Sequence, residues 1–119
     1  MSQKILICDD EEGIRESLKL ILSDFYELIL AKDGTQCLDC LAKSKDIGLV
    51  LMDIKMPKVN GLEVLKQIKD KFPKLNVVII TGYKSVETAT EAVRLGASGY
   101  IVKPFKSEEI LSTVKTTLN

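Results

Sequence analysis

The sequence predicts an α/β protein with a doubly wound (βα)₅ fold, in which helices cover both faces of a five-stranded parallel sheet. Five short apolar segments recur along the 119 residues, and most of them are continuously apolar, as is typical of strands buried on both faces. Amphipathic stretches with a helical period lie between these segments. The regular alternation of strand and helix therefore predicts crossover connections and a single domain covering residues 1–119.

The predicted strands share a short length and a high content of aliphatic residues. They are Lys4–Cys8, Tyr26–Ala31, Leu49–Asp53, Val77–Thr81 and Gly99–Val102. Three intervening or terminal stretches have apolar residues at helical spacing. These faces consist of Ile14, Leu18, Ile21, Leu22 and Phe25, then Leu62, Leu65, Ile68 and Phe72, and finally Ile110, Val114 and Leu118.

The helix that follows the third strand has recognisable ends. Asn60 and Glu63 have the spacing of a capping box, and Pro73 ends the same helix. The charged residues on its other side are expected to be solvated surface. They include Lys66, Lys69, Asp70 and Lys71.

Composition limits the possible functions of the chain. Apolar residues make up 45% and charged residues 29% of a chain with zero formal net charge, which indicates a globular protein without overall attraction to DNA or anionic membranes. No segment approaches the roughly eighteen apolar residues of a membrane span, and the start, MSQK, leaves no room for a signal peptide. We therefore expect a cytoplasmic protein that binds neither nucleic acid nor membrane directly. Because the sequence stops with the fifth helix, we expect any second domain to have been cut away or never to have existed.

The chain contains no histidine and three cysteines. The absence of histidine excludes Ser-His-Asp and Cys-His catalysis, histidine metal ligation and a phosphohistidine donor role for this chain. Cys37 and Cys40 form a C-x-x-C pattern inside the second predicted helix, which differs from a thioredoxin-like redox pair, and two thiols alone make a poor zinc site. We expect Cys8 and Cys37 to be buried and Cys40 to be more exposed.

Polar residues that suit phosphate chemistry lie at the ends of four predicted strands. Asp9 and Asp10 follow the first strand, Asp53 ends the third, Thr81 ends the fourth and Lys103 follows the fifth. The carboxyl ends of parallel strands meet at one edge of a sheet, where open α/β sheets bind ligands. Carboxylates gathered there repel one another unless a cation or proton joins them, and an all-oxygen site suits Mg²⁺. We therefore predict a metal-assisted phosphate-chemistry site.

Each residue type at this edge has a chemical role to offer. Asp53 can be a nucleophile, since carboxylates form aspartyl phosphates. Mg²⁺ and Lys103 can neutralise a transferring phosphoryl group, and the Thr81 hydroxyl can donate to a phosphoryl oxygen. If the three acids are closely packed, removing Asp10 relieves a buried repulsion and raises stability in metal-free buffer.

Four segments of the chain resemble, in order and spacing, the receiver domain of two-component response regulators. They are ILICDDEE, LVLMDIKMPKVNG, VVIITGY and GASGYIVKPF, so that the resemblance covers essentially the whole chain. It implies a flavodoxin-like sheet with strand order 2-1-3-4-5. It also implies that Asp53 is the phosphoacceptor and that Thr81 and Lys103 bind the phosphoryl oxygens. The implied ligands of Mg²⁺ (or Mn²⁺) are Asp9, Asp10, Asp53 and the backbone carbonyl of Lys55.

The resemblance implies a signalling role with external partners. A sensor histidine kinase or a histidine phosphotransfer protein would supply the phosphoryl group. Thr81 and Tyr100 would act as a switch that shifts the face formed by the fourth helix, fifth strand and fifth helix. That face would control a C-terminal output domain or a downstream protein, or form a phosphorylation-dependent dimer. We expect no turnover of an external substrate, so the chain is not an enzyme beyond assisting its own phosphorylation and dephosphorylation.

Three other functions fit the residues less well. A haloacid-dehalogenase-like phosphatase places its nucleophile on the first strand in a D-x-D arrangement, whereas this chain has adjacent acids and no cap domain. A flavodoxin-like electron carrier needs a phosphate-binding loop after the first strand, and the acidic loop here would repel a flavin phosphate. A receiver-shaped module that never takes phosphate is disfavoured by the complete set of site residues and by Gly82, which leaves room for a phosphoryl group.

Two large side chains are expected to flank the approach to the phosphoacceptor. Lys55 lies two residues after Asp53, and Tyr83 lies two residues after Thr81. By the resemblance, these positions are associated with tuning of the hydrolysis rate. We expect Lys55 and Tyr83 to shield the phosphoryl group, the alternative being that both point into solvent.

Overall fold

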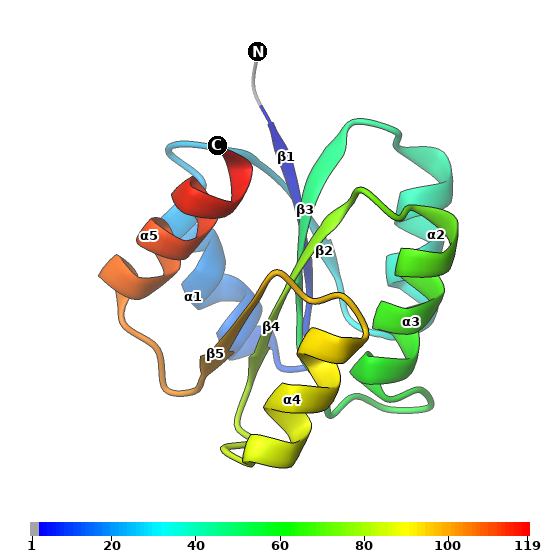
Figure 1. The fold of residues 1–119 in the computed structure, drawn as a ribbon. Helices are drawn as coiled ribbons and strands as arrows, with labels where there is room; N and C mark the ends of the chain where they lie inside the picture. Colours follow the sequence, from blue (N-terminus) through cyan, green and yellow to red (C-terminus); the bar gives the residue numbers. More distant parts are fainter. Residues whose placement is uncertain (1–2) are drawn as a thin grey trace.

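The computed structural model describes residues 3–119, and strands and helices alternate along this range as (βα)₅ (Figure 1). The five strands are all parallel and form one sheet in the order β2-β1-β3-β4-β5. The predicted fold class and the implied strand order are therefore confirmed. The strands are β1 (Lys4–Cys8), β2 (Glu27–Ala31), β3 (Ile47–Met52), β4 (Asn76–Thr81) and β5 (Gly99–Val102).

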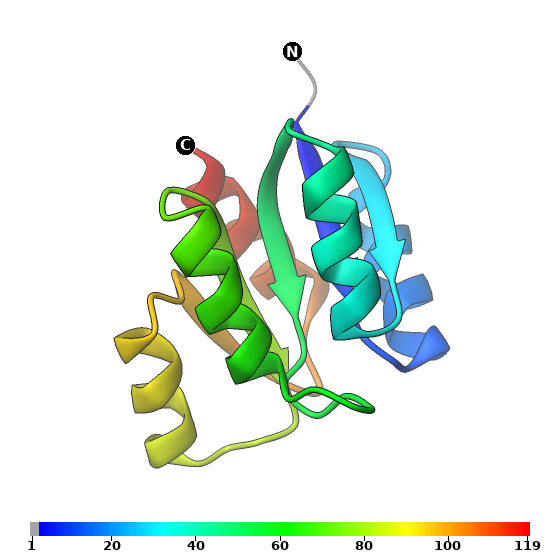
Figure 2. The ribbon, with the colours of Figure 1, turned by 90° about the vertical axis from the view of Figure 1, so that its right-hand side faces the viewer.

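Helices cover both faces of the sheet, as Figures 1 and 2 show. One face packs against α1 (Glu12–Leu22) and α5 (Ser107–Leu118). The other packs against α2 (Gly34–Lys43), α3 (Gly61–Lys71) and α4 (Val86–Arg94). In β1, Ile5 and Ile7 point into the first core and Leu6 and Cys8 into the second, because successive side chains of a strand alternate between faces. Burial on both faces explains why this strand is continuously apolar.

The ends of α3 follow the predicted signals with one difference. Asn60 caps the helix as predicted, but its side-chain oxygen accepts a hydrogen bond from the Leu62 N–H, at 2.7 Å, rather than from that of Glu63. Such a cap contributes about 1 kcal/mol. The helix ends at Lys71, two residues before Pro73. In the described part of the chain, no helix has the length and apolarity needed to cross a membrane.

Two expectations about side chains are wrong, while the other predicted face residues are buried or half-buried. Phe25 is exposed because α1 ends at Leu22, so that Phe25 falls in the following turn and no longer follows the helical period. Lys69 is half-buried and not simply solvated. Its ammonium donates to the Leu75 carbonyl at 2.8 Å, and its methylenes pack against Gly96, as long charged side chains often do.

The cysteines behave as predicted. Cys8 and Cys37 are buried, Cys40 is half-buried, and all three are free. The neighbouring Cys37 thiol and burial raise the pKa of the Cys8 thiol, so that Cys8 stays protonated at neutral pH. A protonated, buried thiol is a packing residue rather than a nucleophile.

Candidate functional site

The carboxyl edge of the sheet holds three buried polar side chains, which come from neighbouring strands. Asp9 follows β1, Asp53 follows β3 and Thr81 ends β4. The strand hydrogen bonding continues through both acids, because the Asp9 N–H donates to the Ala31 carbonyl at 3.1 Å and the Asp53 N–H donates to the Cys8 carbonyl at 3.0 Å. The sheet itself therefore sets the relative positions of the two buried carboxylates.

Asp9, Asp10 and Asp53 form the acidic group predicted from the sequence. Each contributes a carboxylate oxygen, and these oxygens all lie within 4.8 Å of one another. The three acids are not equivalent, since Asp9 and Asp53 are buried whereas Asp10 is exposed. The expectation that Asp10 takes part in a buried repulsion is therefore wrong. Asp9 still belongs to the strand ladder and points inward, and Asp10 is the first residue beyond it.

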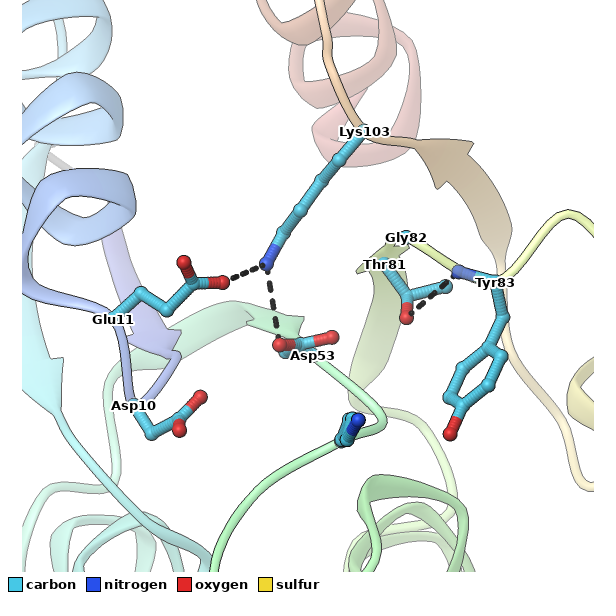
Figure 3. Close-up of a pocket in the computed structure, with 8 residues that line it drawn as sticks. Asp10, Glu11, Asp53, Thr81, Gly82, Tyr83 and Lys103 are labelled. Carbon is cyan, nitrogen blue, oxygen red and sulfur yellow. Dashed lines mark hydrogen bonds and ion pairs between the residues drawn. The ribbon is translucent and has the colours of Figure 1, made fainter.

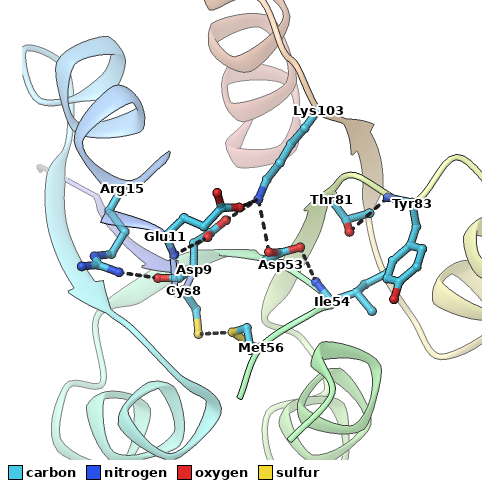
Figure 4. Close-up of polar contacts among 10 residues, drawn as sticks. All are labelled: Cys8, Asp9, Glu11, Arg15, Asp53, Ile54, Met56, Thr81, Tyr83 and Lys103. Atoms are coloured by element: carbon cyan, nitrogen blue, oxygen red, sulfur yellow. Dashed lines mark hydrogen bonds and ion pairs between the residues drawn. The ribbon is translucent and has the colours of Figure 1, made fainter. Parts of the chain in front are cut away.

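Lys103 connects the two buried acids (Figure 4). Its ammonium lies 2.8 Å from Asp9 Oδ2 and 3.2 Å from Asp53 Oδ2. A third carboxylate, that of Glu11, lies 3.4 Å away and can be followed in Figure 3. The contact with Glu11 was not predicted. The run of acids from Asp9 to Glu12 was the only signal that a further acid could reach the site.

Burial and the neighbouring charged groups shift the pKa values of Asp9 and Lys103 in opposite directions. Burial raises the pKa of Asp9, and hydrogen bonds from Lys103 and the Glu11 N–H offset only part of this effect. Burial favours the neutral form of Lys103, but its hydrogen bonds and charge interactions with Asp9 and Asp53 outweigh burial and raise its pKa. Lys103 is therefore charged at neutral pH and is the internal counter-ion of the acids.

Hydrogen bonds from neighbouring residues fix the orientation of both buried carboxylates. Asp9 Oδ1 accepts from the Glu11 N–H at 2.9 Å, and Arg15 donates to the Asp9 carbonyl at 2.7 Å. Asp53 Oδ1 accepts from the Ile54 N–H at 2.7 Å. All three contacts are drawn in Figure 4. Fixed orientation reduces the reorganisation needed when a ligand binds.

Gly61 supports the loop after β3 for a steric reason. A side chain at this position would overlap the Asp53 carbonyl oxygen and come within 2.7 Å of the Ile54 Cα. The Gly61 N–H also donates to the Ile54 carbonyl at 2.7 Å. Only glycine permits this close approach of the start of α3 to the residues around Asp53.

An open cleft of about 400 Å³ lies over Asp53 (Figure 3). Its walls contain most of the predicted site residues together with Glu11. They are Asp10, Glu11, Asp53, Lys55, Thr81, Gly82, Tyr83 and Lys103. A side chain on Gly82 would meet nothing within 4 Å, in agreement with the expectation of free space beside Thr81. Lys55 and Tyr83 lie at the cleft, as expected.

Tyr83 connects Thr81 with Tyr100, which does not line the cleft. The Tyr83 N–H donates to the Thr81 hydroxyl oxygen at 3.4 Å. The Tyr83 carbonyl accepts a hydrogen bond from the Tyr100 hydroxyl at 2.9 Å. The loop after β4 therefore links a buried hydroxyl at the cleft to an aromatic ring on β5.

Comparisons with known proteins identify the family and agree with the fold. The family model of the response regulator receiver domain matches residues 5–115. The chain is 38% identical over 119 residues to the response regulator MprA of Mycobacterium bovis, which aligns 99% of this chain with 51% of that protein. The chain thus spans about half the length of the curated relatives it matches.

Solved structures are similar over nearly the whole chain. A response regulator receiver domain protein (CheY-like) from Methanospirillum hungatei has a TM-score of 0.94 and 32% identity, and the match covers 99% of this chain and 94% of that one. The CheX-CheY-BeF3-Mg²⁺ complex from Borrelia burgdorferi has a TM-score of 0.92 and 26% identity, and covers 98% of this chain and 90% of that one.

Proposed function

This chain belongs to the response regulator receiver domain family, and from that premise we propose that Asp53 accepts a phosphoryl group from a phosphohistidine donor. The donor is a sensor histidine kinase or a histidine phosphotransfer protein, since this chain has no histidine. Residues 1–119 act as one receiver domain in the cytoplasm. The family is a signalling family, and no external substrate is turned over. The observation that carries the proposal is the buried Asp53 carboxylate, which faces an open cleft beside Lys103 and Thr81.

Phosphoryl transfer to Asp53 is a displacement at phosphorus. A carboxylate oxygen of Asp53 forms the new bond, the phosphorus–nitrogen bond of the donor breaks, and the electron pair returns to the imidazole of the donor. The Ile54 N–H fixes the orientation of the carboxylate. Lys103 and the Thr81 hydroxyl donate to the phosphoryl oxygens, and Gly82 leaves room for the group.

The acidic group fits a divalent cation. Three carboxylates within 4.8 Å outweigh the single charge of Lys103, and carboxylate oxygens are the ligands that Mg²⁺ prefers; Mn²⁺ accepts the same ligands. The proposed ligands are Asp9, Asp10, Asp53 and the backbone carbonyl of Lys55. When bound, the ion would neutralise charge on the phosphoryl oxygens.

The loop after β4 couples phosphorylation of Asp53 to a change at Tyr100 on β5. The Thr81 hydroxyl can donate to a phosphoryl oxygen while its oxygen still accepts from the Tyr83 N–H, so a Thr81 side chain drawn toward the phosphoryl group pulls on the loop at Tyr83. Tyr83 in turn holds the hydroxyl of Tyr100, so a shift of this loop frees Tyr100 to turn inward. The α4-β5-α5 face then changes and controls a C-terminal output domain or a downstream protein, or forms a dimer. The greater length of the relatives supports an output domain.

Labelling with a small acyl phosphate in the presence of Mg²⁺ tests the proposal. Mass spectrometry should find the phosphoryl group on Asp53 in the wild type and in Asp70→Asn, a control at an exposed acid on α3. Asp53→Asn should carry no label, because an amide is a far weaker nucleophile than a carboxylate. Label on the same peptide of Asp53→Asn, or an unlabelled wild type, would contradict the proposal.

A further inference from the structure

We infer that Glu11 is a positioning residue: in the unphosphorylated protein it occupies the Lys103 N–H that a phosphoryl oxygen takes after transfer. The inference rests on the proposed function of Asp53 and Lys103. Glu11 thereby competes with the incoming group and sets how readily the site accepts it. Figure 3 shows the Lys103 ammonium joined by dashed lines to the carboxylates of Glu11 and Asp53.

The hydrogen-bond donors of Lys103 are fully used. A lysine ammonium has three N–H donors and no acceptor. Its three partners are carboxylates, those of Asp9, Asp53 and Glu11, at 2.8, 3.2 and 3.4 Å. A phosphoryl oxygen can therefore bind Lys103 only by displacing one of these partners.

Glu11 is the partner that can leave at the lowest cost. The Asp9 carboxylate is buried, forms the shortest contact and is also held by the Glu11 N–H. The Asp53 carboxylate is buried and carries the phosphoryl group itself. The Glu11 side chain is 64% exposed and forms the longest contact, so that water can solvate its carboxylate after release.

The position of Glu11 at the start of α1 supports a dedicated role. Glu11 is the N-cap residue of α1, where an acidic side chain would ordinarily accept hydrogen bonds from the first turn. Its side chain makes no such capping bond. Instead it reaches Lys103, which is 92 residues away in the sequence. The Glu11 side chain therefore contacts Lys103 at the cleft and does not cap the helix.

Removing the charge of Glu11 should favour anion binding. The site would keep its proposed metal ligands, while Lys103 would gain a free donor and the cleft would lose one negative charge. Contacts between exposed charges are weak, so we expect a two- to five-fold effect and not a complete change. Glutamine keeps the length of the side chain and the backbone bond to Asp9.

The test compares Glu11→Gln with Glu12→Gln. Glu12 is the next residue, is exposed, does not line the cleft and has no ion pair among residues 3–119. The affinity for beryllofluoride at saturating Mg²⁺ should rise two- to five-fold in Glu11→Gln and stay within about 1.5-fold of wild type in Glu12→Gln. In ligand-free and metal-free protein, the NMR signals of the Lys103 side chain should shift in Glu11→Gln only.

The outcomes separate this inference from the proposed function. Equal gains in the two variants would show a general charge effect and overturn the inference, as would an unchanged Lys103 signal in Glu11→Gln. A wild type that binds no beryllofluoride and takes no acyl-phosphate label would instead contradict the proposed function. The Lys103 signal tests the contact with Glu11 even in that case.

Discussion

Two lysine-centred clusters lie at opposite ends of the sheet and differ in burial. At the amino end, Lys4 lies 3.0 Å from Asp46 and 3.5 Å from Glu27, whose side chains are 64% and 58% exposed. At the carboxyl end, Lys103 lies at comparable distances from Asp9 and Asp53, whose side chains are 3% and 5% exposed. Both clusters are therefore lysine–carboxylate contacts of similar length, but the acids of the first are exposed to water and Asp9 and Asp53 of the second are buried.

This difference in burial distinguishes the Lys4 cluster, which is a surface ion pair, from the Lys103 cluster, which belongs to the candidate site. Water solvates the charges around Lys4, so each contact there contributes about 0–1 kcal/mol. Asp9 and Asp53 beside Lys103 have lost their water, and their desolvation is only partly offset by one lysine. Such a buried cluster of charges contributes little to the stability of the fold. Instead, the poorly neutralised acids can bind a cation, and the lysine can bind an anion.

Removing each lysine is the strongest test of the comparison. Lys103→Met should destabilise the metal-free protein by about 3 kcal/mol, because it leaves buried carboxylates without a counter-ion. Lys4→Met should cost less than about 1 kcal/mol. Urea unfolding at neutral pH measures both. Similar losses in the two variants would show that burial does not distinguish the clusters.

Mg²⁺ should stabilise the protein through the carboxyl end only. A ligand at 100 times its dissociation constant adds about 2.7 kcal/mol to the stability, and Asp10→Asn should lose most of this gain. Without metal, Asp10→Asn should change stability by less than about 0.5 kcal/mol, because Asp10 is exposed. Asp46→Asn, at the amino end, serves as the control and should respond to Mg²⁺ as the wild type does. A full Mg²⁺ response in Asp10→Asn would remove Asp10 from the site.

Side chains at the mouth of the carboxyl-end cleft should slow loss of the phosphoryl group. Lys55 and Tyr83 line the cleft over Asp53, where they can hinder a water in line with the new bond. Replacing both by alanine should speed hydrolysis several-fold, about 1 kcal/mol in the barrier. The matched control replaces two exposed lysines at the opposite end of the sheet, Lys45 and Lys74, and should leave the decay unchanged. Equal decay in all three proteins would show that neither side chain shields the site.

In metal-free buffer, the pKa of Asp9 and that of Asp46, one acid from each cluster, should be shifted in opposite directions. The pKa of Asp9 is raised by burial, so its protonated form favours the fold; this contribution is complete below the unfolded pKa of about 3.9 and is lost as pH rises through the folded pKa. The pKa of Asp46 is lowered by its hydrogen bond with Lys4, so its contribution is present above about 3.9 and is lost as pH falls through the folded pKa. Carboxyl carbon NMR shifts measure both. An Asp9 pKa below that of Asp46 would contradict the comparison.

The local pattern of the sequence was sufficient to predict the secondary structure elements and the edge of the sheet at which the site lies. The presence of five strands, the cap at Asn60 and the helical position of Cys37 and Cys40 depend on short-range periodicity and turn chemistry, which neighbouring residues carry. The bounds of the third strand differ from the expected ones, since it runs from Ile47 to Met52 instead of from Leu49 to Asp53. The meeting of Asp9, Asp10 and Asp53 at the carboxyl edge also follows from the sequence, because parallel strands bring their ends together. The strand order came from the family resemblance.

Tertiary structure decided the environment of those residues. Asp9 and Asp10 are adjacent and chemically identical, yet only Asp9 is buried, because β2 and β3 flank the end of β1. The contact of Glu11 with Lys103, the exposure of Phe25 and the anchoring role of Lys69 were likewise not predictable from local pattern. Each depends on how far a side chain reaches and on what the rest of the chain packs against it, and burial of this kind is a property of distant segments brought together by the sheet.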